Sequence, residues 1–259
     1  MFALRVGLDL QSLAIPLREA LHAAAGLGAD AVVIDARGAV RSGEFSRTAV
    51  RELRKMLEDF RLRVAAISYR TRRGLVTMDE LDRRVDGTKA AMEIAHSLGA
   101  NVVIGTLGPL PPPDSDSWQV LAAVLDDVGR HGHRVGAMLA AETGTDGGET
   151  LAGLLRVLPE GTLGIDFNPG NLVISGLDPR EAVDALGAWI LHVHASDALF
   201  GLTNSRGVRV PLGEGSVDMP ALLGALEEFG YRGYITIDVQ PADDALRQAA
   251  TAIRYLRRL

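Results

Sequence analysis

Four polar residues end short strand-like segments of the sequence, and their types suit metal binding or proton transfer. These residues are Glu142 in AMLAAE, Asn168 in LGIDFN, His194 in ILHVH and Asp238 in YITID. Side chains alternate between the two faces of a strand, so His192 shares a face with His194, and Asp166 shares one with Asn168. Carboxylates, an amide and imidazoles gathered on one side predict a site that binds a divalent cation or moves protons.

The two outer carboxylates are the candidates for acid–base work. Glu142 could bind a metal or transfer a proton, or instead cap the following loop or pair with an arginine. Asp238 could act with Glu142 on opposite faces of a bound substrate, or instead anchor a neighbouring loop. Their positions at the ends of strands favour the functional interpretation for both residues.

The middle positions offer oxygen and nitrogen ligands. Asp166 lies deeper in the expected site and Asn168 nearer its mouth, and either could supply an oxygen to a cation. Asp166 could equally form a buried pair with an arginine or histidine. His194 is a candidate metal ligand. His192 could be a ligand or a substrate contact, or it could be a residue of the core. Asp197 could orient His194 or only cap the turn that follows.

The elements that would position these residues alternate between strand-like and helical runs. The strands are predicted at Val6–Leu10, Ala31–Ala36, Val64–Tyr69, Asn101–Thr106, Ala137–Glu142, Leu163–Asn168, Ile190–Ser196 and Tyr234–Val239. The helices are predicted at Pro16–Leu27, Arg47–Phe60, Met78–Leu98, Ser117–His131, Glu149–Val157, Pro179–Leu186, Met219–Phe229 and Asp243–Leu256. Such alternation predicts an α/β fold, a single (β/α)8 TIM barrel of parallel strands over residues 1–259. An open doubly wound sheet is disfavoured because no G-x-G-x-x-G follows the first strand.

A long loop after the seventh predicted strand carries two arginines. The segment DALFGLTNSRGVRVPLG spans Asp197–Gly213, and long loops at this end of a barrel often bind ligands. Arg206 and Arg209 could contact an anionic substrate such as a phosphate. Each could also be an ordinary solvated arginine.

Composition and charge narrow the function classes. The formal charge of −6 and the pI near 5.5 argue against a protein that grips nucleic-acid phosphates. No cysteine is present, which excludes disulfides, thiolate metal sites and a cysteine nucleophile. No apolar stretch approaches the length needed to span a membrane, and the first residues do not form a signal peptide. We therefore expect a cytoplasmic protein that acts on small molecules.

Several segments, in their order along the chain, resemble the xylose isomerase-like barrel superfamily, specifically its sugar isomerase/epimerase branch. They are AMEIAHSLGANVVI, the segment around Glu142, DFNPGNL, HVHASD and PLGEGSVDMPALLGALEEFGYRGYITID. The resemblance implies one manganese, magnesium, cobalt or zinc ion. It assigns the ligand roles to Glu142, Asp166 or Asn168, His194 and Asp238. It also implies that Glu142 and Asp238 move protons on the carbon next to a substrate carbonyl.

Three positions depart from the pattern of that superfamily. Asn168 stands where the family carries an aspartate ligand, and an amide oxygen is a weaker, neutral ligand. Asp238 replaces a glutamate, which shortens the side chain by one methylene. Glu214 stands in a loop that more often carries arginine or lysine. With His192 and Arg206, Glu214 completes the residues predicted to contact substrate.

Three functions are compatible with these residues. The first is a metal-dependent isomerase or epimerase of a small sugar, cyclitol or sugar phosphate that works through an enediolate. The second is a lyase or dehydratase of the inosose or dehydroshikimate type. The third is a sugar-binding barrel without catalysis, for which Asn168 and Asp238 are the evidence. A homo-oligomer is compatible with each of them.

Overall fold

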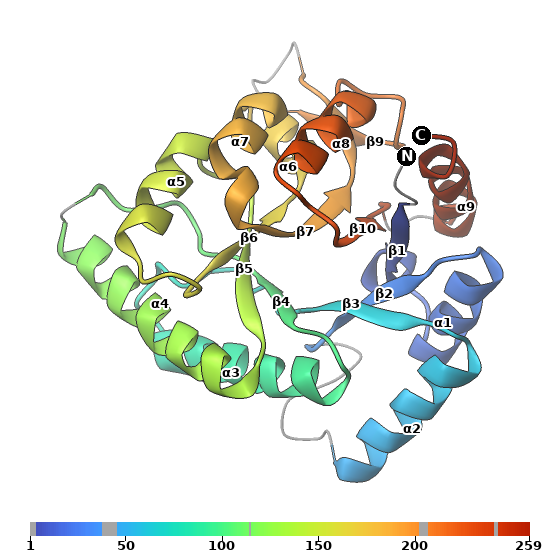
Figure 1. Ribbon diagram of the computed structural model, residues 1–259, viewed down its shortest axis with the longest axis horizontal. Helices are drawn as coiled ribbons and strands as arrows, with labels where there is room; N and C mark the ends of the chain where they lie inside the picture. The colour runs from blue at the N-terminus through green and yellow to red at the C-terminus, as the bar shows by residue number, and fades with distance from the viewer. Residues whose placement is uncertain (1–3, 38–45, 114, 202–206, 241–242) are drawn as a thin grey trace.

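Eight parallel strands close into a barrel in the computed structural model, which describes residues 4–37, 46–113, 115–201, 207–240 and 243–259 (Figure 1). The barrel strands are β1 (Arg5–Asp9), β2 (Ala31–Asp35), β3 (Arg63–Ser68), β4 (Val102–Gly105), β5 (Met138–Glu142), β6 (Gly164–Phe167), β7 (Ile190–Ala195) and β10 (Tyr234–Ile237). The closing pair is β1 with β10. The predicted fold, a (β/α)8 TIM barrel, is confirmed.

A helix follows each barrel strand and packs on the outside of the barrel (Figure 1). These helices are α1 (Leu17–Gly26), α2 (Arg47–Asp59), α3 (Leu81–Ser97), α4 (Asp116–Val135), α5 (Gly148–Val157), α7 (Pro179–Leu186), α8 (Met219–Glu228) and α9 (Ala245–Leu256). Each overlaps the segment predicted as helical. None of the helices in the described part of the chain is long and apolar enough to cross a membrane.

A short helix and a hairpin were not expected from the sequence. A short helix, α6 (Pro169–Ile174), starts directly after β6, with Asn168 as its N-cap. The loop after β7 folds into an antiparallel hairpin of β8 (Asp197–Leu199) and β9 (Val208–Val210). Both additions lie at the C-terminal ends of the barrel strands, which is where the site residues are found.

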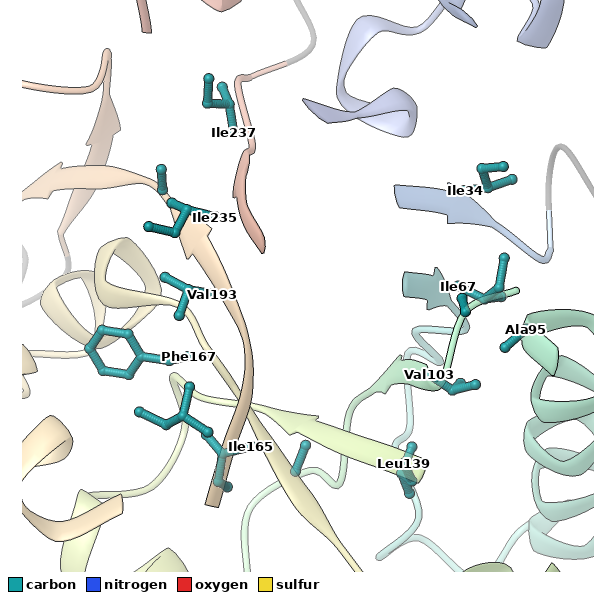
Figure 2. Packing of buried hydrophobic residues seen from close by; sticks show 14 of the residues in the cluster. Ile34, Ile67, Ala95, Val103, Leu139, Ile165, Phe167, Val193, Ile235 and Ile237 are labelled. Carbon is teal, nitrogen blue, oxygen red and sulfur yellow. The ribbon is translucent and has the colours of Figure 1, made fainter. Parts of the chain in front are cut away.

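Alternation along the strands builds two layers of core. The larger residues point outward against the helices, and Figure 2 shows Ile34, Ile67, Val103, Leu139, Ile165, Phe167, Val193, Ile235 and Ile237 among them. A second cluster on the opposite strand faces consists mostly of small residues, namely Ala31, Val33, Ala65, Ala66, Val102, Ile104 and Ala140. The large outer residues fix the barrel against its helices, and the inner face of β6, β7 and β10 remains free for polar groups.

Candidate active site

Asp166 on β6 lies at the centre of a buried polar cluster. Its Oδ1 accepts hydrogen bonds from Nδ1 of His192 at 2.7 Å and from Nδ1 of His194 at 2.9 Å. All three side chains are essentially inaccessible to solvent. Burial acts to raise the pKa of Asp166, but the two imidazoles outweigh it and hold the pKa below its usual range. Asp166 therefore fixes the orientation of both histidine rings.

These hydrogen bonds set the tautomers of the histidines. With Nδ1 donating to Asp166, Nε2 of His192 accepts from the hydroxyl of Thr236 at 3.0 Å. Nε2 of His194 lies 3.1 Å from Nη2 of Arg70. A guanidinium only donates, so the contact with Arg70 uses the lone pair on Nε2 of His194. Burial acts to lower the pKa of His194, but Asp166 and Asp9 raise it to about 10, so a proton and Arg70 compete for the same lone pair.

Arg70, in the loop after β3, reaches across the mouth of the barrel. Its Nε donates to Oε2 of Glu142 at 2.8 Å, and its Nη1 donates to Oδ2 of Asp9 at 3.2 Å and to Oγ of Ser68 at 3.4 Å. Burial acts to lower the pKa of Arg70, but the carboxylates of Glu142 and Asp9 raise it. Arg70 was not identified from the sequence. Because a guanidinium stays protonated, Arg70 brings a permanent positive charge to the point where β1, β5 and β7 converge.

Glu142 ends β5 and connects Arg70 with the start of α6. Its Oε1 accepts from Nδ2 of Asn168 at 3.0 Å and from Nδ2 of Asn171 at 3.4 Å. The oxygen of the Asn168 side chain is engaged elsewhere, because it accepts from Oγ of Ser196 at 2.5 Å and from the backbone N–H of Asn171 at 3.2 Å. Asn168 therefore presents its amide nitrogen to Glu142, and its oxygen caps the helix.

Asp238 follows β10 and pairs with an arginine of the hairpin. Nη1 of Arg209 lies 2.5 Å from Oδ2 of Asp238, and Nη2 of Arg209 donates to Oδ1 of Asn171 at 2.6 Å. Since Asn171 also contacts Glu142, a chain of polar contacts links the two carboxylates predicted as acid and base. The carboxylate of Asp238 itself is directed at Arg209.

Three other residues singled out in the sequence lie away from this cluster or outside the described structure. Asp197 accepts hydrogen bonds from the backbone N–H groups of Ala198, Gly213, Gly215 and Val217, so it holds the loop that leads to α8. Its contacts are those of a loop anchor and do not orient His194. Glu214 is exposed and lies in a surface hollow beside α9. Arg206 lies outside the described residues.

Two hollows open at opposite ends of the barrel. One, of about 320 Å³, lies at the C-terminal end and is lined by Glu142, Asn171, Thr71, Thr106, Thr143 and Ser175, with others. The larger, of about 920 Å³, lies at the N-terminal ends of the strands, lined by Arg5, Arg63 and Tyr234 among others. Active sites of TIM barrels lie at the C-terminal end. The smaller hollow, which reaches Glu142, is therefore the candidate substrate site.

One group of residues in the cluster could hold a metal ion, and another group does not fit one. The ligand atoms of Asp166, His192 and His194 all lie within 4.8 Å of one another, and the buried Oδ2 of Asp166 has no hydrogen-bond partner among the described residues. This group could hold a metal ion. The four-residue set implied by the resemblance does not fit one in this conformation. Arg70 engages Glu142 and His194, a cap engages the Asn168 oxygen, and Arg209 engages Asp238.

Comparison with known proteins adds a family match. A family model described as xylose isomerase-like TIM barrel matches residues 21–259. An inosose dehydratase of Lacticaseibacillus casei is 24% identical over 200 residues, which cover 63% of this chain and 66% of that protein. This chain therefore spans slightly less than two thirds of the length of that relative.

Solved structures share the whole fold. A xylose isomerase domain protein from Planctomyces limnophilus superposes with a TM-score of 0.87 at 24% identity, covering 98% of this chain and 95% of that one. A D-tagatose 3-epimerase-like protein gives a TM-score of 0.79 at 22% identity, with 98% and 97% covered.

Structures of the same fold include some that hold ligands. The IOLI protein has a binding zinc atom, and a barrel from Mycobacterium smegmatis is in complex with magnesium, at 16% and 17% identity and a TM-score of 0.78 each. They cover 98% and 100% of this chain, and this chain covers 98% and 96% of theirs. The D-allulose 3-epimerase from Methylomonas sp. is in complex with D-allulose, at 17% identity, with 99% and 97% covered and a TM-score of 0.76.

Proposed function

Because the chain belongs to the xylose isomerase-like TIM barrel family, we propose that it is an isomerase or epimerase of a small sugar, cyclitol or sugar phosphate. The reaction would move protons on the carbon next to a carbonyl. The observation that carries the proposal is the carboxylate of Glu142, which lines the hollow at the barrel mouth and contacts the guanidinium of Arg70. Arg70 would thus supply a positive charge beside a carboxylate that can act as a base.

Glu142 is the proposed base. Its side chain is 9% exposed, and Arg70, Asn168 and Asn171 hold its two oxygens in place. A carboxylate oriented in this way can take a proton from a carbon atom held above it in the hollow. The negative charge that then develops on the substrate oxygens would be stabilised by the donors of Arg70.

Asp238 is the proposed second acid–base group, and Arg209 sets its position. The hydroxyl and amide groups that line the hollow, among them Thr71, Thr106 and Asn171, suit the many hydroxyls of a sugar. The substrate contacts expected of His192, Arg206 and Glu214 stay predictions, as do a cytoplasmic location and a homo-oligomer.

These steps use only side chains of this protein. The manganese, magnesium, cobalt or zinc ion implied by the resemblance also stays a prediction. Asp166, His192 and His194 are the group that could hold it.

A dehydratase is the second candidate, because an inosose dehydratase is among the relatives found by sequence. It would share the removal of a proton beside a carbonyl, and a hydroxyl group would then leave. A sugar-binding barrel without catalysis is the third, supported by the amide at Asn168 and the ion-paired Asp238.

One experiment separates the three candidates. The protein is incubated in D2O with a panel of ketoses, ketose phosphates and inososes, and the products are examined by NMR and mass spectrometry. Deuterium on the carbon next to the carbonyl, together with an isomeric product, supports the proposed function. Loss of water from the substrate supports the dehydratase. If every compound stays unchanged although some bind in calorimetry, the catalytic proposal is wrong.

A further inference from the structure

The guanidinium of Arg70 lies where ligands expected for a divalent ion converge. We propose that Arg70 is the resident cation of this site and that it excludes a divalent ion from the space between Glu142 and His194. Nε and Nη2 of Arg70 lie 2.8 Å from Oε2 of Glu142 and 3.1 Å from Nε2 of His194. A metal would use the same oxygen and nitrogen lone pairs at about 2.0–2.2 Å, so the ion and the guanidinium cannot be present together.

Arg70 also balances the charge of the carboxylates around it. Asp9, Glu142 and Asp166 place three carboxylates close to Arg70, and Arg70 contacts the first two directly. Buried carboxylates require positive partners. The arginine side chain supplies a charge that it does not lose, and its planar fork fits several acceptors at once. The site thus contains its own counter-ion.

Two residues that depart from the family pattern also disfavour a divalent ion. Asn168 removes one negative charge from the expected ligand set, and its oxygen caps α6. Arg209 neutralises a second charge, that of Asp238. Both changes weaken the attraction of the site for a divalent ion. The negative charge that remains still attracts the single positive charge of Arg70. The departures in sequence and the position of Arg70 therefore point the same way.

Arg70 also keeps one donor for a substrate. A guanidinium has five N–H groups. Nε donates to Glu142, the two of Nη1 donate to Asp9 and Ser68, and one of Nη2 donates to His194. The second N–H of Nη2 takes no partner among the described residues, and the side chain is 23% exposed. Its use on a substrate oxygen rests on the proposed function, whereas the exclusion of the ion does not.

Titration of chelator-treated protein with MnCl2 in a calorimeter tests the exclusion without any turnover. The wild type should show no stoichiometric Mn²⁺ site that depends on Glu142. Arg70→Met should bind one Mn²⁺ at least about tenfold more tightly than the wild type, a difference of about 1.4 kcal/mol. Glu142→Gln, added to Arg70→Met, should remove that gain. Mn²⁺ should also raise the Tm of Arg70→Met more than that of the wild type.

Two control variants separate charge from loop position. Arg70→Lys keeps a positive charge but not the planar fork, so it should bind Mn²⁺ more weakly than Arg70→Met. Arg73→Met removes an exposed arginine of the same loop, paired with Asp79, and should resemble the wild type.

The inference is overturned if the wild type binds one Mn²⁺, Glu142→Gln abolishes that binding, and Arg70→Met does not tighten it. If Arg70→Met does not fold, the wild type and Glu142→Gln decide alone: stoichiometric binding that Glu142→Gln abolishes overturns the inference. Mn²⁺ binding that Glu142→Gln leaves unchanged would lie outside the space between Glu142 and His194 and would support the assignment of Arg70. Because no readout uses substrate, failure here is distinct from failure of the proposed reaction.

Discussion

Asp166 accepts a hydrogen bond from His194, with 2.9 Å between Oδ1 and Nδ1. The contact decides which ring nitrogen of His194 faces the mouth of the barrel, because it holds the proton on Nδ1. The lone pair on Nε2 is then directed at Arg70. One buried carboxylate thus controls the environment of the cation on which the proposed chemistry depends.

We predict that Asp166→Asn destabilises the protein. The amide oxygen can still accept from one histidine, but the charge that supports both imidazole N–H groups is lost. The expected loss in the free energy of unfolding is about 2 kcal/mol, measured by urea denaturation. Asp184→Asn, which removes an exposed partner of Arg180, should change it by less than about 0.5 kcal/mol. Equal stability of the two variants would contradict the central position of Asp166.

The stability of the protein should also fall in acid, because Asp9 and Asp166 must then be protonated, and Asp166→Asn tests this. Burial acts to raise the pKa of Asp9 and Asp166, but His194 and Arg70 hold the pKa of Asp9 below its usual value, and His194 and His192 hold that of Asp166 below its own. The folded protein therefore binds these protons more weakly than the unfolded chain. The resulting stabilisation is complete above the unfolded pKa, about 4, and is lost as the pH falls through the lower folded values. Urea denaturation across acidic pH should show a steeper decline for the wild type than for Asp166→Asn, and identical slopes would refute this linkage.

Two helical glycines should respond in opposite directions to alanine. A Cβ at Gly87 in α3 would overlap the hydroxyl of Tyr69, whereas a Cβ at Gly153 in α5 would meet nothing within 4 Å. We expect Gly87→Ala to lower the free energy of unfolding by about 1–3 kcal/mol through overpacking. Gly153→Ala should raise it by about 0.5–1 kcal/mol, because alanine loses less backbone entropy in a helix. Chemical denaturation measures both, and a neutral Gly87→Ala would mean that α3 does not pack on Tyr69 in this way.

Asp197 should control the loop before α8. Its carboxylate accepts from four backbone N–H groups, three of them at Gly213, Gly215 and Val217. In Asp197→Ala we expect faster hydrogen exchange at those amides and a loss of about 2 kcal/mol of stability. Glu214→Ala, in the same loop but with an exposed side chain, is the matched control. Unchanged exchange in Asp197→Ala would show that the loop is held by other contacts.

The barrel could be predicted from the sequence because its signals are local. Each strand is a short apolar run, each helix has an apolar stripe, and their alternation admits few folds. The short helix α6 was missed although its start signal is present, with Asn168 as N-cap and Pro169 in the first turn. The strands of the hairpin are only three residues long, which leaves no period to detect.

The site could be predicted only in part, because some of its contacts depend on the closed barrel. Glu142, Asp166, Asn168 and His194 were found from their places at strand ends, and the structure brings them together. Arg70 lies in a loop, and its partner Glu142 is 72 residues away in the chain, so no local pattern marks it. The partners of the side-chain oxygens of Asn168 and Asp238 likewise depend on Ser196 and Arg209, which come from other elements.

The central claim, that Glu142 removes a proton beside a substrate carbonyl, is tested most directly by the rate of solvent deuterium exchange at that carbon. The measurement uses NMR in D2O, with whichever compound of the panel the wild type exchanges. We predict that Glu142→Gln slows the exchange at least about 100-fold, whereas Glu149→Gln, an exposed glutamate paired with Arg156, leaves it unchanged. Exchange at the wild-type rate in Glu142→Gln would contradict the account.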